Sequence, residues 1–128
     1  MEYLGNTDLL KLPKTAFLCS QKCPAEVVLR SYDWAKQQRE AGNCIVFGNH
    51  SIIEKDVFQI LLRGNQSLIL MLARGMKSQV EPELQETLKA NRLLVINPFN
   101  QVAKRVTRET ALIRNRKIIE ISNQIVVG

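Results

Sequence analysis

The sequence predicts an α/β fold with a mainly parallel sheet and helices on both faces. Short apolar runs without alternation, which suit strands buried on both faces, are separated by longer stretches whose apolar residues recur at helical spacing. Each strand and the helix that follows it occupy roughly 25–30 residues, as in repeated βαβ units. Glycine, proline and asparagine lie between these segments, where the chain must turn.

The composition is that of one globular domain. The chain has 128 residues, 45% of them hydrophobic and 23% charged, and it carries a formal net charge of +6. This charge permits a polyanionic partner but does not demonstrate one. The N-terminus has no signal-peptide pattern and no apolar run is long enough to span a bilayer, so we expect a cytoplasmic protein without membrane contacts.

Residues 1–14 are expected to form a lead-in segment without regular structure, and residues 15–128 a single domain. The first half of that domain has predicted strands at 15–19 and 44–47 and predicted helices at 25–41 and 52–63. Pro24 lies where a first helical residue would be, and Gly42 lies where the end of a helix favours glycine.

The turn after the second predicted strand is the centre of the functional prediction. Gly48 allows a sharp turn of the backbone or the close approach of a ligand. Ser51, with Glu54 three residues later, has the pattern of a capping box at the start of the next helix. The free amides of that first turn carry the positive end of the helix dipole, so Gly48, Asn49, His50 and Ser51 are predicted to form an anion site.

The second half of the chain continues the alternation. Strands are predicted at 67–72, 93–96 and 124–128, and helices at 82–90 and 103–122. We expect the last helix to be broken near Arg114, because Arg114 and Arg116 are two residues apart and cannot share one face of a helix. The segment 114–116 is therefore predicted in a turn or a first helical turn, where its arginines would bind phosphate.

Four loops are expected to meet where ligands bind a parallel sheet, beyond the carboxyl ends of its strands. These loops are 19–23, 48–51, 73–77 and 97–100. Phe47 and Phe99, at strand ends, are the side chains expected to stack on bases, whereas Trp34 is expected in the core.

Motifs of several enzyme classes are absent from the sequence. There is no Gly-x-Gly-x-x-Gly and no Gly-x-x-x-x-Gly-Lys-Ser/Thr. His50 is the only histidine. A turn histidine that is hydrogen-bonded to the backbone is a simpler interpretation than a catalytic base. Zinc would need His50 together with all three cysteines, of which Cys19 and Cys44 are better explained as small buried residues. No catalytic residue, metal or cofactor is therefore predicted.

Three segments carry a resemblance to a known family. Arg114 to Ile119 reads Arg-Asn-Arg-Lys-Ile-Ile, and it is followed by Ser122 and a final hydrophobic strand. Ser20 follows the first strand, and Gly48 begins a stretch in which Ile53 and Glu54 occupy matching positions. These segments, and essentially all 128 residues, resemble the Rossmann-like core of the DNA processing protein A (DprA, also Smf) family within the SMF/DprA–LOG superfamily. The family has Arg-Asn-Arg-x-Ile at the first segment, Gly-Ser/Thr-Arg at the second, and an aspartate where Glu54 stands.

The resemblance implies a three-layer Rossmann-like fold and a single-stranded DNA-binding module for DNA processing and recombination. It implies phosphate binding at the carboxyl edge of the sheet, help in loading a RecA-type recombinase, and dimerisation through this domain. The alternative is a sensor-type relative that binds a nucleotide or nucleotide-derived ligand in the same pocket. Phosphoribohydrolase relatives carry a Gly-Gly motif that is absent here, so no enzymatic activity is expected. The family's final helix is expected to lie outside the chain.

The loops and the resemblance together predict the residues that bind nucleic acid or phosphate. They are Ser20, Gln21, Gly48, Asn49, His50, Ser51, Arg74, Gly75, Lys77, Arg114, Asn115 and Arg116.

Overall fold

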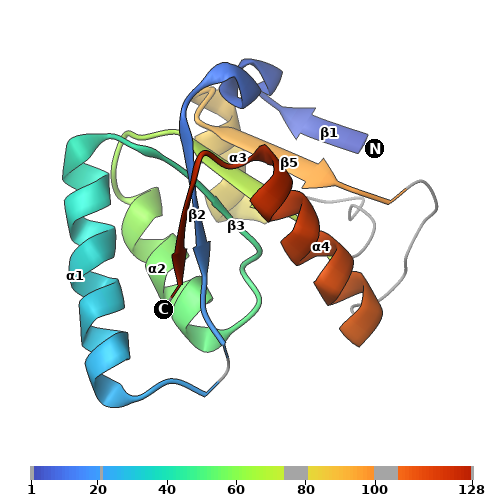
Figure 1. Cartoon of the computed structure of the whole chain (residues 1–128). Helices are drawn as coiled ribbons and strands as arrows, with labels where there is room; N and C mark the ends of the chain where they lie inside the picture. The colour runs from blue at the N-terminus through green and yellow to red at the C-terminus, as the bar shows by residue number, and fades with distance from the viewer. Residues whose placement is uncertain (1, 21, 74–80, 100–106, 128) are drawn as a thin grey trace.

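The computed structural model describes residues 2–20, 22–73, 81–99 and 107–127. Within this part of the chain, strands and helices alternate as the sequence predicts (Figure 1). The elements are β1 (Glu2–Gly5), the 3-10 helix η1 (Thr7–Lys11), β2 (Lys14–Leu18), α1 (Ala25–Ala41), β3 (Cys44–Phe47), α2 (Ile52–Leu62), β4 (Leu68–Met71), α3 (Pro82–Lys89), β5 (Leu93–Asn97), α4 (Arg108–Ile121) and β6 (Gln124–Val127).

The strands form one sheet in the order β1-β5-β4-β3-β2-β6. β1 is antiparallel to β5, and the other neighbouring pairs are parallel. The chain moves outward from β2 through β3 and β4 to β5, and then returns to place β6 on the other side of β2. The strand order therefore reverses at β2, and in open α/β sheets the crevice at such a reversal is where ligands bind.

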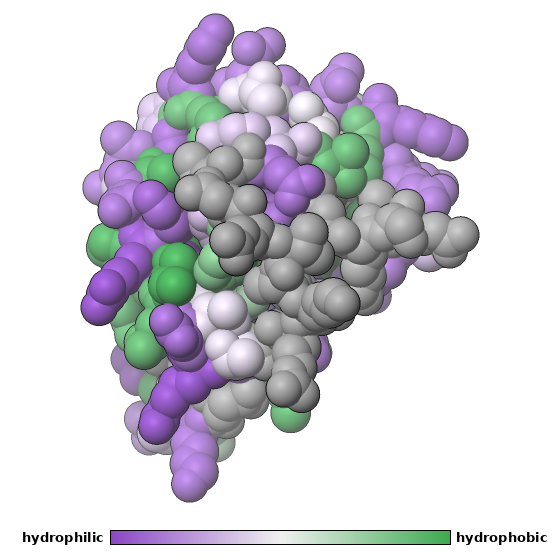
Figure 2. Space-filling model, turned by 90° about the vertical axis from the view of Figure 1, so that its right-hand side faces the viewer, coloured by the Kyte–Doolittle hydropathy of each residue, from purple (hydrophilic) through white to green (hydrophobic). Residues whose placement is uncertain are grey.

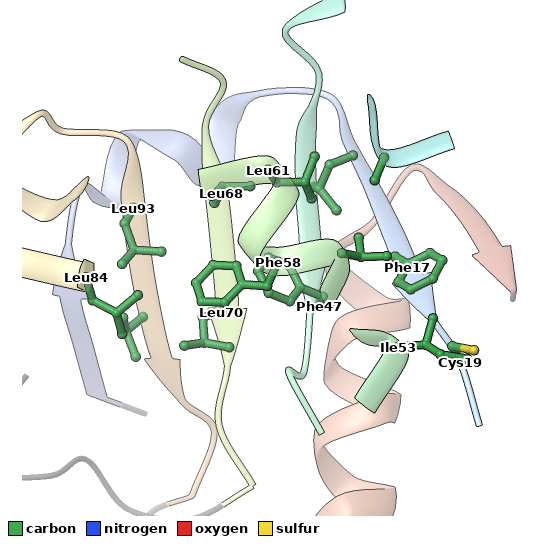
Figure 3. Packing of buried hydrophobic residues seen from close by; sticks show 14 residues of the cluster. Phe17, Cys19, Phe47, Ile53, Phe58, Leu61, Leu68, Leu70, Leu84 and Leu93 are labelled. Atoms are coloured by element: carbon green, nitrogen blue, oxygen red, sulfur yellow. The ribbon is translucent and has the colours of Figure 1, made fainter. Parts of the chain in front are cut away.

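Helices cover both faces of the sheet, which confirms the predicted three layers (Figure 1). On one face, α1, α2 and α3 pack on a cluster with Phe47 and Phe58 near its centre, their ring centroids 4.5 Å apart (Figure 3). On the other face, η1 and α4 contribute Leu9 and Ile118 to a second cluster. Successive strand residues alternate between the two clusters, which is why each strand appears in the sequence as an unbroken apolar run.

The predicted helix ends on either side of β3 are present. Gly42 ends α1 in the left-handed conformation, with φ of 75°. Ser51 and Glu54 form both halves of the predicted capping box at the start of α2. Pro24 is the N-cap of α1 and not its first helical residue, a shift of one position.

Two expectations about the fold were wrong. The lead-in is not irregular, because it contributes β1 and η1. All four β1 residues are exposed, so this edge strand leaves no apolar signal in the sequence. The last helix is not broken near Arg114. α4 is continuous, and Arg114 and Arg116 lie in its middle turns. It begins after Thr107, which forms a capping box with Thr110. The first residues of the predicted 103–122 helix lie outside the described part of the chain.

We predict that two neighbouring isoleucines of α2 differ sharply in their effect on stability. Ile53 is 8% exposed and belongs to the core cluster, whereas Ile52 is 71% exposed. Ile53→Ala should lower the free energy of unfolding by about 2–5 kcal/mol, since it leaves a cavity in the core. Ile52→Ala should change it by less than about 0.5 kcal/mol. Urea denaturation measures both, and equal losses would show that α2 does not pack as described.

Candidate functional site

A buried carboxylate lies inside the turn that follows β3. Glu54 is 3% exposed. Its Oε1 accepts hydrogen bonds from the amides of His50 (2.9 Å) and Ser51 (3.0 Å), and its Oε2 accepts one from the amide of Cys19 (3.1 Å). Two of the amides that were predicted to bind a ligand anion, those of His50 and Ser51, therefore bind the protein's own Glu54 carboxylate. These two amides are not available to a phosphate. A phosphate at this edge of the sheet must therefore be bound by other groups.

Arg114 reaches the same turn from the other face of the sheet. Its side chain is buried, with only 3% of the residue exposed, and it lies against Gly48. A Cβ atom at Gly48 would be 2.6 Å from the Nε of Arg114 and 2.8 Å from its Cζ. Gly48 is needed because an arginine occupies the space of a side chain, and not for a left-handed turn. The left-handed residue here is Asn49, with φ of 52°.

Two buried groups of opposite charge thus flank the Gly48 turn. Burial lowers the pKa of Arg114 below its ordinary value, and the negative charge of Glu54 opposes this shift. The Nε of Arg114 also donates to Oδ1 of Asn115 at 3.1 Å. Removing one member of a buried charge pair leaves the other uncompensated. Arg114 and Glu54 are therefore first of all parts of the framework that shapes the edge.

Two adjoining pockets open at this edge, and together we call them the strand-end groove. The first has a volume of about 290 Å³ and lies between the ends of β2 and β6 and the side of α4. The second has a volume of about 410 Å³ and continues toward the start of α4. His50, Ala111 and Asn115 line both pockets. The groove therefore lies where the strand order reverses, as expected for a ligand site in this architecture.

The groove combines polar and apolar walls. Ser20, His50, Arg114 and Asn115, all predicted from the sequence, contribute its hydrogen-bonding and charged groups. Arg108 and Thr107 also line it, and the sequence prediction missed them because it did not identify Thr107 as a helix N-cap. The buried Glu54 carboxylate and Cys19 also line the first pocket. Apolar side chains complete the walls of the groove: Leu18, Ala111, Leu112 and Val127.

Other predicted residues lie elsewhere. Arg116 is exposed and lines neither pocket, because residues two apart on a continuous helix point in different directions. Ser51 is buried and its Oγ accepts from the amide of Glu54, so it serves the helix cap. Asn49 shapes the turn as its left-handed residue. Four predicted ligands lie outside the described residues: Gln21, Arg74, Gly75 and Lys77.

The aromatic predictions had mixed outcomes. Phe47 was predicted to stack on bases, and this was wrong because it is 1% exposed and packed against Phe58. Trp34 stacks on Phe17 with ring centroids 5.0 Å apart and packs against the core cluster, as predicted. Phe99 is half-buried at the end of β5, and its amide donates to the side chain of Asn97.

In Figure 2, hydrophilic residues dominate the described surface, and hydrophobic residues lie in small separate groups. None of the described helices has the length and apolar character needed to cross a bilayer. Over the same residues, histidine, cysteine and acidic side chains form no group of three that could hold a metal ion.

Two solved structures match the whole of this architecture. DNA processing protein A from Streptococcus pneumoniae superimposes with a TM-score of 0.70 at 26% sequence identity, over 98% of this chain. This chain has the Rossmann-like fold of the DprA proteins. DNA processing protein A from Helicobacter pylori, described as binding single-stranded DNA in a unique mode, gives a TM-score of 0.71 at 19% identity, also over 98% of this chain. The sequence resemblance to DprA is thus confirmed in three dimensions.

The chain is shorter than these DprA proteins. It spans 44% of the Streptococcus pneumoniae chain and 58% of the Helicobacter pylori chain. No family model and no curated protein sequence matches it. The likeness to DprA therefore rests on the fold and on the short sequence segments described above.

We predict that Gly48 and Arg114 are energetically coupled. Gly48→Ala should destabilise the protein by about 1–3 kcal/mol, because the added methyl group overlaps the Arg114 side chain. In the Arg114→Ala background the space is empty, and the same substitution should cost roughly 1 kcal/mol less or even stabilise the fold. Urea denaturation of the wild type, the two single variants and the double variant measures this coupling. An equal cost of Gly48→Ala in both backgrounds would contradict the packing of Arg114 on Gly48.

Proposed function

We propose that this chain binds single-stranded DNA in the strand-end groove and acts without catalysis in DNA processing. The observation that carries the proposal is the groove itself. It lies at the strand-order reversal of a DprA-like sheet. Arg108 and Asn115 on α4, and Ser20 after β2, bring cationic and hydrogen-bonding groups to it. The net charge of +6 supports a polyanionic ligand.

The lining residues have distinct proposed roles. Arg108 is exposed at the start of α4, where its guanidinium can form a paired contact with a phosphate. Ser20, His50 and Asn115 provide shorter polar groups for phosphate or base edges. The apolar wall around Ala111 offers a surface against which a base can pack. Arg114 contributes mainly by its charge and by holding the turn.

The predicted contacts outside the described residues remain part of the proposal. In the sequence, Gln21 comes shortly after β2, and Arg74, Gly75 and Lys77 come shortly after β4. These two strands are parallel members of one sheet, so both end at the same edge. Arg116 would contact the DNA only if the nucleic acid wrapped around α4, so we propose that it contributes little to binding affinity. Loading of a RecA-type recombinase and dimerisation, which the resemblance implies, stay predictions for the whole protein.

A nucleotide or nucleotide-derived ligand is the second candidate. The pocket volumes of about 290 and 410 Å³ favour it, because single small ligands occupy cavities of roughly this size. The two candidates differ in how much ligand is bound. DNA would extend beyond the groove, whereas a nucleotide would be contained within it.

We predict different effects for two exposed arginines of α4. Arg108 lines the groove and Arg116 does not, so Arg116→Ala is a matched control for Arg108→Ala. Arg108→Ala should weaken binding of all base sequences alike and flatten the slope of log affinity on log salt by about 0.7, the value for one phosphate contact on a single strand. Arg116→Ala should leave the slope nearly unchanged. Fluorescence anisotropy with a labelled single-stranded oligonucleotide measures both.

Three outcomes of this titration would count against the proposal. Equal slope losses for both variants would mean that the charge acts only as a diffuse field. Absence of oligonucleotide binding at low salt, with the folded chain confirmed by circular dichroism, would exclude the DNA function. Displacement of the oligonucleotide by equimolar mononucleotide would show that the groove prefers a nucleotide, which is the second candidate ligand.

A further inference from the structure

Two cysteines lie against each other at one end of the strand-end groove. Cys19 follows β2 and Cys23 precedes α1, and their Sγ atoms are 2.9 Å apart. The Cys23 thiol also lies 3.4 Å from the carbonyl oxygen of Ser20, to which it donates. A disulfide bond is about 2.05 Å long, so the two sulfurs need to approach by less than about 1 Å to bond.

The two thiols differ in their surroundings. Cys19 is buried at the edge of the core cluster, near Ile53 (Figure 3), and its backbone amide is tied to Glu54. Cys23 is half-buried and therefore more accessible to a small reagent. Burial raises the pKa of Cys19 to about 12, and the neighbouring Cys23 adds to the shift, so Cys19 is a protonated thiol at neutral pH.

We propose that Cys19 and Cys23 form a site of reversible oxidation, at which a hydroperoxide converts the two thiols into an intrachain disulfide. The inference goes beyond DNA binding and does not depend on it. A pair of adjacent cysteines, one accessible and one beside it to resolve the oxidised sulfur, is the arrangement expected of a redox-sensing site in a reducing compartment.

The chemistry is balanced with hydrogen peroxide as the oxidant. The sulfur of Cys23 attacks one peroxide oxygen, the O–O bond breaks, and one water leaves a sulfenic acid on Cys23. The Cys19 thiol then attacks the Cys23 sulfur, the S–O bond breaks, and the Cys19 proton combines with the departing hydroxide to give a second water. Two thiols and one peroxide thus give one disulfide and two waters. Exchange with a reducing dithiol restores both thiols.

The disulfide would change the edge of the groove. It would fix the loop that carries Ser20, which lines the first pocket together with Cys19. The loop is already held at Cys19 by the hydrogen bond to Glu54. Oxidation would therefore anchor both ends of a short segment at the carboxyl end of β2, beside the residues proposed to contact a ligand.

The third cysteine provides an internal control. Cys44 is buried on the opposite face of the sheet, in the cluster that includes Ile118, whereas Cys19 belongs to the cluster that includes Phe47. The sheet therefore separates Cys44 from the pair. We expect it to stay reduced when the pair is oxidised.

The test treats the reduced, folded chain with hydrogen peroxide and then counts free thiols after denaturation in an alkylating reagent. Peptide mass spectrometry should find Cys19 and Cys23 joined with the loss of two hydrogen atoms, in a monomer, with Cys44 alkylated. In Cys23→Ser no peptide should lose two hydrogens, and Cys19 should stay alkylatable under the same dose. Three free thiols in the treated wild type, a disulfide that joins two chains, or one that includes Cys44 would each overturn the proposal.

A reducing step completes the experiment. Incubation of the oxidised chain with a dithiol should restore three alkylatable cysteines. Persistence of an oxidised product after this treatment would show overoxidation to sulfinic acid and would contradict reversibility. These outcomes are independent of the oligonucleotide titration, because neither measurement uses the ligand of the other.

Discussion

The carboxylate of Glu54 is the constraint on which the functional edge depends. It is buried, and it is hydrogen-bonded to three backbone amides from two different segments of the chain. Two of these amides lie between β3 and α2 and the third follows β2, so one side chain connects the ends of two adjacent strands. A buried carboxylate without such partners would destabilise the fold strongly. Arg114, packed on Gly48 from α4, adds a positive charge and links the opposite layer to the same turn.

This arrangement determines where an external anion can bind. A helix start after a strand is a common phosphate site in α/β proteins, because its amides are free and its dipole is positive. Just before α2, Glu54 uses the amides of His50 and Ser51 internally, so a DNA phosphate in the groove cannot bind these two amides and depends more on side chains. The groove has such side chains beside an apolar wall, with Arg108 at the start of α4 and Asn115 further along it. A side-chain site of this kind explains why binding is proposed here without a glycine-rich phosphate loop.

Much of the fold could be predicted because its signals are local. Strands buried on both faces leave unbroken apolar runs, and the capping box of Ser51 and Glu54 spans only four residues. β1 could not be predicted, since an exposed edge strand of four residues has no apolar pattern. The site was predicted less well, because its contacts join residues that lie far apart in the sequence. The sequence predicted that Arg114 and Arg116 act together as phosphate ligands. Only the folded chain shows that Arg114 packs against Gly48, whereas Arg116 lies outside the groove. The burial of Phe47 likewise follows from its contact with α2.

The most direct test of the account is a map of ligand contacts on the folded chain. Two-dimensional amide spectra of the isotope-labelled protein would be recorded during titration with a short single-stranded oligothymidine. We expect the largest chemical-shift changes at Ser20, His50, Arg108 and Asn115, and little change in α3 or β1, which lie away from the groove. Shifts concentrated in α3 and β1, with those four residues unaffected, would contradict the central claim that the strand-end groove binds DNA.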